Sequence, residues 1–159
     1  MSTIKQIASS MSLKAVEDLR INLEAMPADK QDWRPLDLGR SALSLVQECA
    51  VINGFFATIL RDQAVPAMDW GAYKAACAAL DTPEKATAAL TESGTALAAA
   101  IEAFPEDRMA ETVTMPFAEG MVMSFAQVMF TAYWNMTYHT GQIAYIQTLY
   151  GDNEMHGKH

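Results

Sequence analysis

The sequence predicts an all-α fold, a bundle of four long helices in one domain, and three observations support that prediction. Apolar residues recur at helical spacing through four long segments. N-capping residues, prolines and a glycine mark the ends of these segments. A chain of 159 residues, 51% of them hydrophobic, can bury the core that such a bundle needs.

The first long helix is expected at residues 3–26. Ile4, Ile7 and Met11 begin an apolar series with charged residues between its members, as in a helix with one buried face. Pro27 ends the segment, because proline cannot continue a helix. A charged connector that includes a proline and a glycine follows, and it is expected to be a loop.

The second long helix is expected at residues 41–62, because Ser41 is a good N-cap and an apolar stripe follows it. Pro66 then interrupts the helical pattern. The alanine-rich stretch at residues 70–80 predicts a short extra helix.

The third long helix is expected at residues 82–104. Thr82 suits the N-cap, Pro83 suits the first helical position, and a further proline stops the helix. Residues 111–115 are the only β-like stretch, and they predict an extended loop or a small hairpin.

The fourth long helix is expected at residues 124–150, with Gly151 just beyond its end. Its apolar stripe is continuous and consists of Phe125, Val128, Met129, Ala132, Met136, His139, Ile143 and Ile146. There is no internal repeat and no second domain, so residues 1–159 are expected to form one unit.

The net charge of −8 argues against a nucleic-acid partner and against an anionic membrane surface. The two cysteines, Cys49 and Cys77, form neither a disulfide framework nor a thiolate zinc motif. The N-terminus lacks the apolar run of a signal peptide, and no stretch is expected to span a bilayer. A cytoplasmic location is therefore expected.

Three polar residues interrupt the apolar faces of the second and fourth helices. Glu48 lies in the stripe of the second helix, one turn after Leu45. His139 lies in the stripe of the fourth helix, and Asn135 precedes it by one turn, so both can address one point. A buried carboxylate needs a partner, so we expect Glu48 and His139 to meet in the bundle interior, with Asn135 beside them.

The sequence around these residues resembles the DinB-like superfamily. The fourth helix reads Tyr-Trp-Asn-Met-Thr-Tyr-His-Thr-Gly-Gln-Ile at residues 133–143, where the family has a His-x3-His pair before a Gly-Gln step. Residues 33–41, with Trp-Arg-Pro followed by Gly-Arg-Ser, resemble the family's approach to its second helix. Residues 45–48, Leu-Val-Gln-Glu, correspond to the family's Leu-Val-x-His segment.

The resemblance implies a four-helix bundle in which three histidines hold a divalent metal, usually nickel or zinc. Some relatives use the metal in thiol-dependent transfer or isomerisation, and others are described as hydrolases. Glu48 and Asn135 stand here where the family has histidines, and only His139 remains. A neutral amide oxygen is a weak ligand for either metal, so any nickel or zinc is expected to be weakly bound or absent.

Three interpretations of these residues remain open. Glu48 and His139 can form a two-ligand metal centre assisted by Asn135 or Gln142, a hydrogen-bonded pair left from a lost metal site, or an acid–base pair. The hydrogen-bonded pair is favoured, because two good ligands rarely hold a metal against water. Asn53, Tyr138 and Gln142 are expected to line a pocket near the site.

Two arginines precede the second helix, and each has two possible roles. Arg34 and Arg40 can bind an anion near the loop or pair with Asp32 or Asp37, and surface pairing is the expectation.

The sequence therefore predicts a protein with a degenerate metal site that binds a small molecule or keeps a vestigial activity. The alternative is an active metal-dependent transferase or hydrolase that uses an unusual Glu/His site. The expected protein partner is a second copy of the chain, which would form a homodimer through the long helices.

Overall fold

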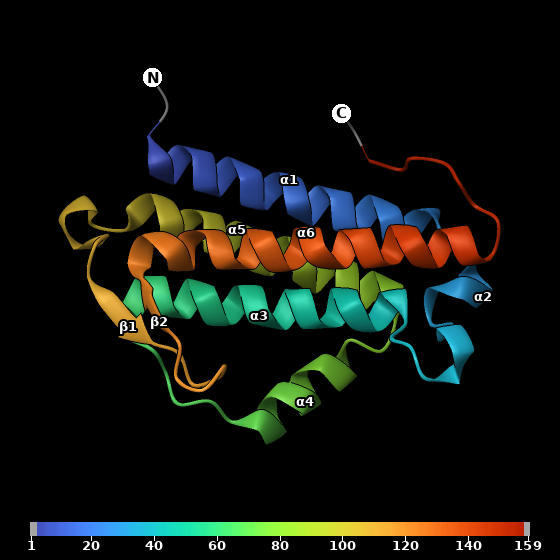
Figure 1. Ribbon diagram of the computed structural model, residues 1–159, viewed down its shortest axis with the longest axis horizontal. Coiled ribbons are helices and arrows are strands. Elements are labelled where there is room, and N and C mark those ends of the chain that lie inside the picture. Colours follow the sequence, from blue (N-terminus) through green and yellow to red (C-terminus); the bar gives the residue numbers. More distant parts are fainter. Residues whose placement is uncertain (1–2, 158–159) are drawn as a thin grey trace.

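The computed structural model describes residues 3–157, and within them four long helices pack side by side (Figure 1). These helices are α1 (Ile4–Ala25), α3 (Ala42–Asp62), α5 (Pro83–Ala103) and α6 (Phe125–Leu149). The predicted all-α bundle is confirmed, and each predicted long helix lies within one residue of the observed one at both ends.

Each long helix begins where a hydroxyl side chain satisfies backbone N–H groups that have no partner inside the helix. Thr3 and Ser124 form capping boxes with Gln6 and Gln127, respectively. Ser41 and Thr82 accept from the backbone N–H groups three residues later. The capping residues that the sequence indicates therefore set the starts of the helices.

The chain does not alternate direction at every connection. The N-terminal halves of α3 and α5 share one cluster of buried residues with the C-terminal halves of α1 and α6. The opposite halves share the second cluster. Therefore α1 runs parallel to α6, and both run antiparallel to α3 and α5, as Figure 1 shows.

A long connection between α3 and α5 makes this topology possible. Because α5 runs in the same direction as α3, the chain must return along the length of the bundle, about 30 Å for a helix of this size. The return segment contains the predicted short helix, α4 (Trp70–Ala79), which lies outside α3 (Figure 1). Asp69 fixes the start of α4 by accepting from the N–H groups of Gly71 and Ala72.

The remaining connections contain short elements. The predicted loop at residues 28–40 holds α2 (Ala28–Gln31) and the 3₁₀ turn η1 (Pro35–Asp37), and a second turn, η2 (Glu106–Arg108), follows α5.

The predicted extended stretch becomes the first strand of a hairpin. Strand β1 (Thr112–Thr114) pairs antiparallel with β2 (Val122–Ser124), with Val113 opposite Met123. The loop between the strands brings Phe117 toward α3, where its ring lies 6.5 Å from that of Phe55.

By length and composition, α3 is apolar enough to cross a membrane, which corrects the expectation that no stretch is. More than half of its most apolar window, 56%, is buried inside the bundle. Residues such as Leu45, Cys49 and Ile59 belong to the protein core. The apolar character of α3 is thus accounted for by its packing against α5 and α6.

Candidate functional site

Glu48 of α3 and His139 of α6 meet as the sequence predicts. His139 Nε2 lies 3.0 Å from Glu48 Oε1, and the two side chains are 5% and 22% exposed, respectively. The contact forms because α3 and α6 are neighbours and both residues lie on the helix faces that point inward.

Arg40 and Gln142 extend this pair into a polar network of four side chains. Arg40 Nη1 donates to Glu48 Oε2 at 2.6 Å, while Nη2 donates to the Ser44 carbonyl oxygen at 3.0 Å. On the other side, His139 Nδ1 lies 2.6 Å from Gln142 Oε1. The expectation that Arg40 pairs with Asp32 or Asp37 is wrong, because its guanidinium reaches past the helix start to Glu48.

The partners of His139 determine where its protons lie. Both ring nitrogens face oxygen atoms, so when Gln142 presents its amide oxygen the ring can donate to Gln142 or to Glu48, and to both only with a proton on each nitrogen. If the Gln142 amide is turned over, a neutral ring still donates Nε2–H to Glu48. When Nε2–H is the donor to Glu48, a metal at this nitrogen would have to replace that proton.

Glu48 is ionised in this setting. The hydrogen bond from His139, followed by the charge and hydrogen bond of Arg40, lowers the pKa of Glu48 from 4.5 to about 2, against the opposing effect of burial. Burial has the opposite consequence for the adjacent Cys49, whose thiol pKa is raised. Cys49 is therefore a core thiol and not a thiolate.

Asn135 lies beside the pair, one turn before His139. Its Nδ2 donates to Cys49 Sγ at 3.7 Å. Together with Glu48 it lines a cavity of about 250 Å³ between α3, α4, α6 and the hairpin. The cavity, referred to below as the Glu48 cavity, is lined by Glu48, Ile52, Phe56, Met68, Trp70, Tyr73, Phe117, Thr131, Trp134 and Asn135.

The three residues expected to line a pocket occupy different places. Asn53 is fully buried in the core, where its Nδ2 contacts Met136 Sδ at 3.4 Å and its Oδ1 has no partner within the described residues. Gln142 holds His139. Tyr138 is exposed and stacks on Trp134, and with Arg40 and Gln142 it lines a separate depression.

Sequence reasoning missed the aromatic residues of the Glu48 cavity. Trp70 and Tyr73 come from α4, and Phe117 comes from the hairpin loop. Their common signal is an aromatic ring in or next to a connecting segment between the long helices. Only the folded chain shows that these segments converge on Glu48.

Residues 13–143 match the sequence pattern of the DinB superfamily. The chain belongs to that superfamily. The match spans α3, the Glu48 cavity and most of α6, so it includes both Glu48 and His139.

Solved structures show the same fold. YfiT from Bacillus subtilis, described as a probable metal-dependent hydrolase with an unusual four-helix bundle topology, superposes with a TM-score of 0.73 at 17% identity, over 92% of this chain and 87% of that one. A mycothiol-dependent maleylpyruvate isomerase gives a TM-score of 0.69 at 14% identity, over 90% of this chain but 63% of the enzyme. A mutant of that enzyme gives 0.71. No curated protein matches the chain.

The residues present do not fit a tightly held nickel or zinc ion. Residues 3–157 contain no group of three His, Cys, Asp or Glu side chains that could hold a metal. His139, Glu48 and Asn135 offer one imidazole, one carboxylate and one amide, and a neutral amide is a weak ligand. Arg40 Nη1 and His139 Nε2 already occupy the two carboxylate oxygens of Glu48, so a metal ion would have to displace one of them in order to coordinate.

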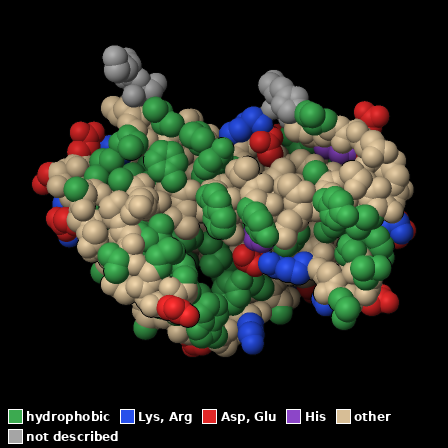
Figure 2. All heavy atoms as spheres, viewed as in Figure 1, with side chains coloured by type: hydrophobic (Ala, Val, Ile, Leu, Met, Phe, Trp, Pro, Cys, Tyr) green, Lys and Arg blue, Asp and Glu red, His purple; other side chains and the backbone are tan. Residues whose placement is uncertain are grey.

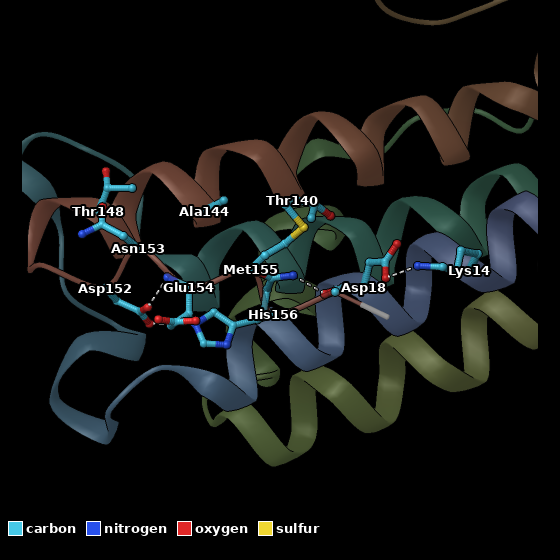
Figure 3. Close-up of a pocket in the computed structure, with 12 residues that line it drawn as sticks. Lys14, Asp18, Thr140, Ala144, Thr148, Asp152, Asn153, Glu154, Met155 and His156 are labelled. Carbon is cyan, nitrogen blue, oxygen red and sulfur yellow. Dashed lines mark hydrogen bonds and ion pairs between the residues drawn. The ribbon is translucent and has the colours of Figure 1, made fainter. Parts of the chain in front are cut away.

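A second hollow, of about 390 Å³, lies away from this network, between α1, α6 and the C-terminal tail. Figure 3 shows Lys14 and Asp18 on one side of it and the tail residues Asp152 to His156 on another. His156 Nε2 pairs with Asp152 Oδ2 at 2.8 Å, a contact within the tail itself.

Proposed function

We propose that this chain is a small-molecule-binding member of the DinB superfamily, in which a polar network takes the place of the family's metal. The observation that carries the proposal is the position of the Glu48 carboxylate. It lies between the Arg40 guanidinium and the His139 imidazole, and it forms one wall of the Glu48 cavity. A mostly apolar cavity with a few converging polar groups is typical of a small-molecule site.

In relatives with three histidines, a metal would be the partner of the buried polar side chains at this position. In this chain the polar network provides those partners instead. A buried carboxylate is costly unless it is paired, and here a guanidinium and an imidazole both donate to it. The network thereby satisfies the buried groups at the family's metal position without an ion. A ligand in the cavity would meet a fixed, ionised carboxylate and an amide from Asn135.

The alternative is a metal-dependent transferase or hydrolase that uses the Glu48 and His139 pair. It is favoured by one feature, the convergence of Glu48 Oε1 and His139 Nε2 on one point. Zinc or nickel would then have to displace the Nε2 proton and compete with Arg40 for the carboxylate.

A titration with nickel or zinc separates the two functions. We expect the natural chain to bind either metal weakly by calorimetry and to lose it to a chelator. Replacing Glu48→His and Asn135→His would surround one point with three imidazoles, including His139, which these metals favour. The double variant should bind at least about a hundredfold more tightly, and added metal should raise its Tm.

The control for this titration carries two extra imidazoles elsewhere. Thr137→His with Ala99→His adds them at exposed positions of α6 and α5, so it should bind no better than the natural chain. Stoichiometric metal that survives chelation in the natural chain would instead establish the alternative. If the Glu48→His/Asn135→His variant binds no better than the control, the correspondence with the family's ligand positions is wrong.

We also propose that two copies of the chain pair through α6 and that they do so in the cytoplasm. None of the 25 residues of α6 is Asp, Glu, Lys or Arg, although Tyr138, Tyr145 and Leu149 are exposed. Figure 2 shows apolar side chains over the face that α6 presents. Two unpaired cysteines support a reducing compartment.

A further inference from the structure

We infer that the Glu48 cavity takes a small organic cation, specifically an alkylated ammonium group. This inference rests on the proposed small-molecule function and adds the chemical class of the ligand. Five of the ten lining residues are aromatic, and one of the other five is a carboxylate. Aromatic faces around one acidic group are the arrangement that recognises quaternary ammonium ions.

The aromatic rings reach the cavity from four separate elements. Phe56 comes from α3, Trp70 and Tyr73 from α4, Phe117 from the hairpin loop and Trp134 from α6. Such convergence is not a requirement of the core, because Trp70 and Trp134 are 50% and 64% exposed. Tyr138 stacks on one face of Trp134, which leaves the other face of Trp134 and the half-exposed ring of Trp70 as π surfaces that an entering cation can contact.

Contacts between elements hold these rings in place. Trp70 and Tyr73 meet edge to face with centroids 5.8 Å apart. The far end of α4 is tied to α3 because Gln47 Nε2 donates to the Leu80 carbonyl oxygen at 2.8 Å. The rings of α4 are therefore positioned before a ligand arrives, which reduces the entropy lost on binding.

The charged side chain among the ten lining residues is Glu48, whose carboxylate is paired with Arg40 and His139. No Lys, Arg or His side chain lines the cavity within the described part of the chain. Arg40 approaches Glu48 from outside the cavity and lines the separate depression with Tyr138. The net charge of −8 also favours the approach of a cation over that of an anion.

The size of the cavity limits the ligand. At about 250 Å³ it lies below the usual range for drug-sized ligands, so a nucleotide or a cofactor is too large. A trimethylammonium head with a short alcohol tail fits this limit. Thr131 and Asn135, on the α6 side, offer hydrogen-bonding groups to such a tail.

The inference is tested with choline and its neutral isostere, 3,3-dimethylbutan-1-ol, which differ only in the charged nitrogen. Calorimetry, and the fluorescence of Trp70 and Trp134, should show that choline binds at least about fivefold more tightly. Equal binding of the two would overturn the cation inference and leave the small-molecule function standing. If choline does not bind, the inference is also overturned, and the metal titration decides the proposed function separately.

Three variants locate the selectivity. Trp134→Leu removes an aromatic face and should weaken choline about threefold to thirtyfold, while Trp134→Phe should recover most of the loss. Glu48→Gln should weaken choline and leave the neutral isostere unchanged. The Tm of each variant checks that it is folded.

The matched control removes a ring from the same helix but outside the cavity. Tyr145→Leu should leave the affinity for choline unchanged, because Tyr145 lines only the depression beside Arg40. Equal losses in Trp134→Leu and Tyr145→Leu would overturn the assignment of the cation to the Glu48 cavity.

Discussion

Glu48 is the residue at the centre of the polar network, because its two carboxylate oxygens contact His139 and Arg40. An ionised carboxylate carries a negative charge and can only accept hydrogen bonds. Each of its buried oxygen atoms therefore needs a hydrogen-bond donor. His139 and Arg40 provide these donors at 3.0 and 2.6 Å. An arginine from the segment before α3 is thereby part of the site.

The depressed pKa of Glu48 predicts a specific loss of stability in acid. Because the folded-state value of about 2 lies below the usual 4.5, Glu48 contributes stability that is present above pH 4.5 and is lost as the pH falls toward 2. The contribution is at most about 3 kcal/mol. Urea unfolding at a series of pH values should show a larger free energy of unfolding for the natural chain than for Glu48→Gln. This difference should shrink as the pH falls from 4.5 toward 2.

An Arg40→Gln variant tests the assigned causes. This variant keeps the His139 hydrogen bond, which is the largest cause of the lowered pKa of Glu48. Its pH-dependent loss of unfolding free energy should therefore be smaller than that of the natural chain and larger than that of Glu48→Gln. If the natural chain and Glu48→Gln lose stability in parallel from pH 5 to pH 2, Glu48 is not held as described.

The polar centre of the site could be predicted from the sequence, but its outer parts could not. Glu48 and His139 stand out because a charged and a polar residue interrupt apolar stripes of fixed helical period. Arg40 precedes the helix and has a long, flexible side chain, so its partner depends on where α3 begins and which way the guanidinium turns. The rings of α4 and the hairpin carry no periodic signal.

At the scale of the elements, the crossing of α1 and α5 depends on a glycine. A Cβ atom at Gly94 would lie 2.5 Å from Cγ2 of Val16, closer than carbon atoms approach. The valine cannot easily move away, because a β-branched side chain in a helix has one preferred rotamer. The absence of a side chain at Gly94 therefore lets the two helix backbones approach.

Gly94→Ala should destabilise the protein by about 1–2 kcal/mol, even though alanine favours a helix by about 1 kcal/mol over glycine. The measurement is the free energy of unfolding in urea. In a Val16→Ala background the same change should be neutral or stabilising, because the clash is gone.

Gly54→Ala is the matched control, since Gly54 lies inside α3 and a Cβ there would meet nothing within 4 Å. It should gain about 0.5–1 kcal/mol. A stabilising Gly94→Ala in the natural background would show that the crossing is not limited by this contact.

The long helices could be located from the sequence because each has its own start and stop residues, such as Thr82 with Pro83. Their relative directions could not. The spacing of apolar residues indicates which face of a helix is buried. It does not indicate which neighbouring helix covers that face. The parallel run of α3 and α5 depends on the length of the return segment and on side chains, such as Gln47, that fasten it.

For the whole molecule, the uncharged outer face of α6 predicts a homodimer. A chain of net charge −8 repels its own copy wherever acidic residues face each other, and α6 has none of them. Sedimentation at micromolar protein should give twice the 17.4 kDa of one chain.

In a two-fold interface each substitution occurs on both chains, so Tyr138→Glu with Tyr145→Glu should bring carboxylates together and yield a monomer. Leu13→Glu adds a charge at an exposed apolar position of α1 and should leave the dimer intact. A natural chain that stays monomeric, or a dimer that survives both tyrosine substitutions, would exclude pairing through α6.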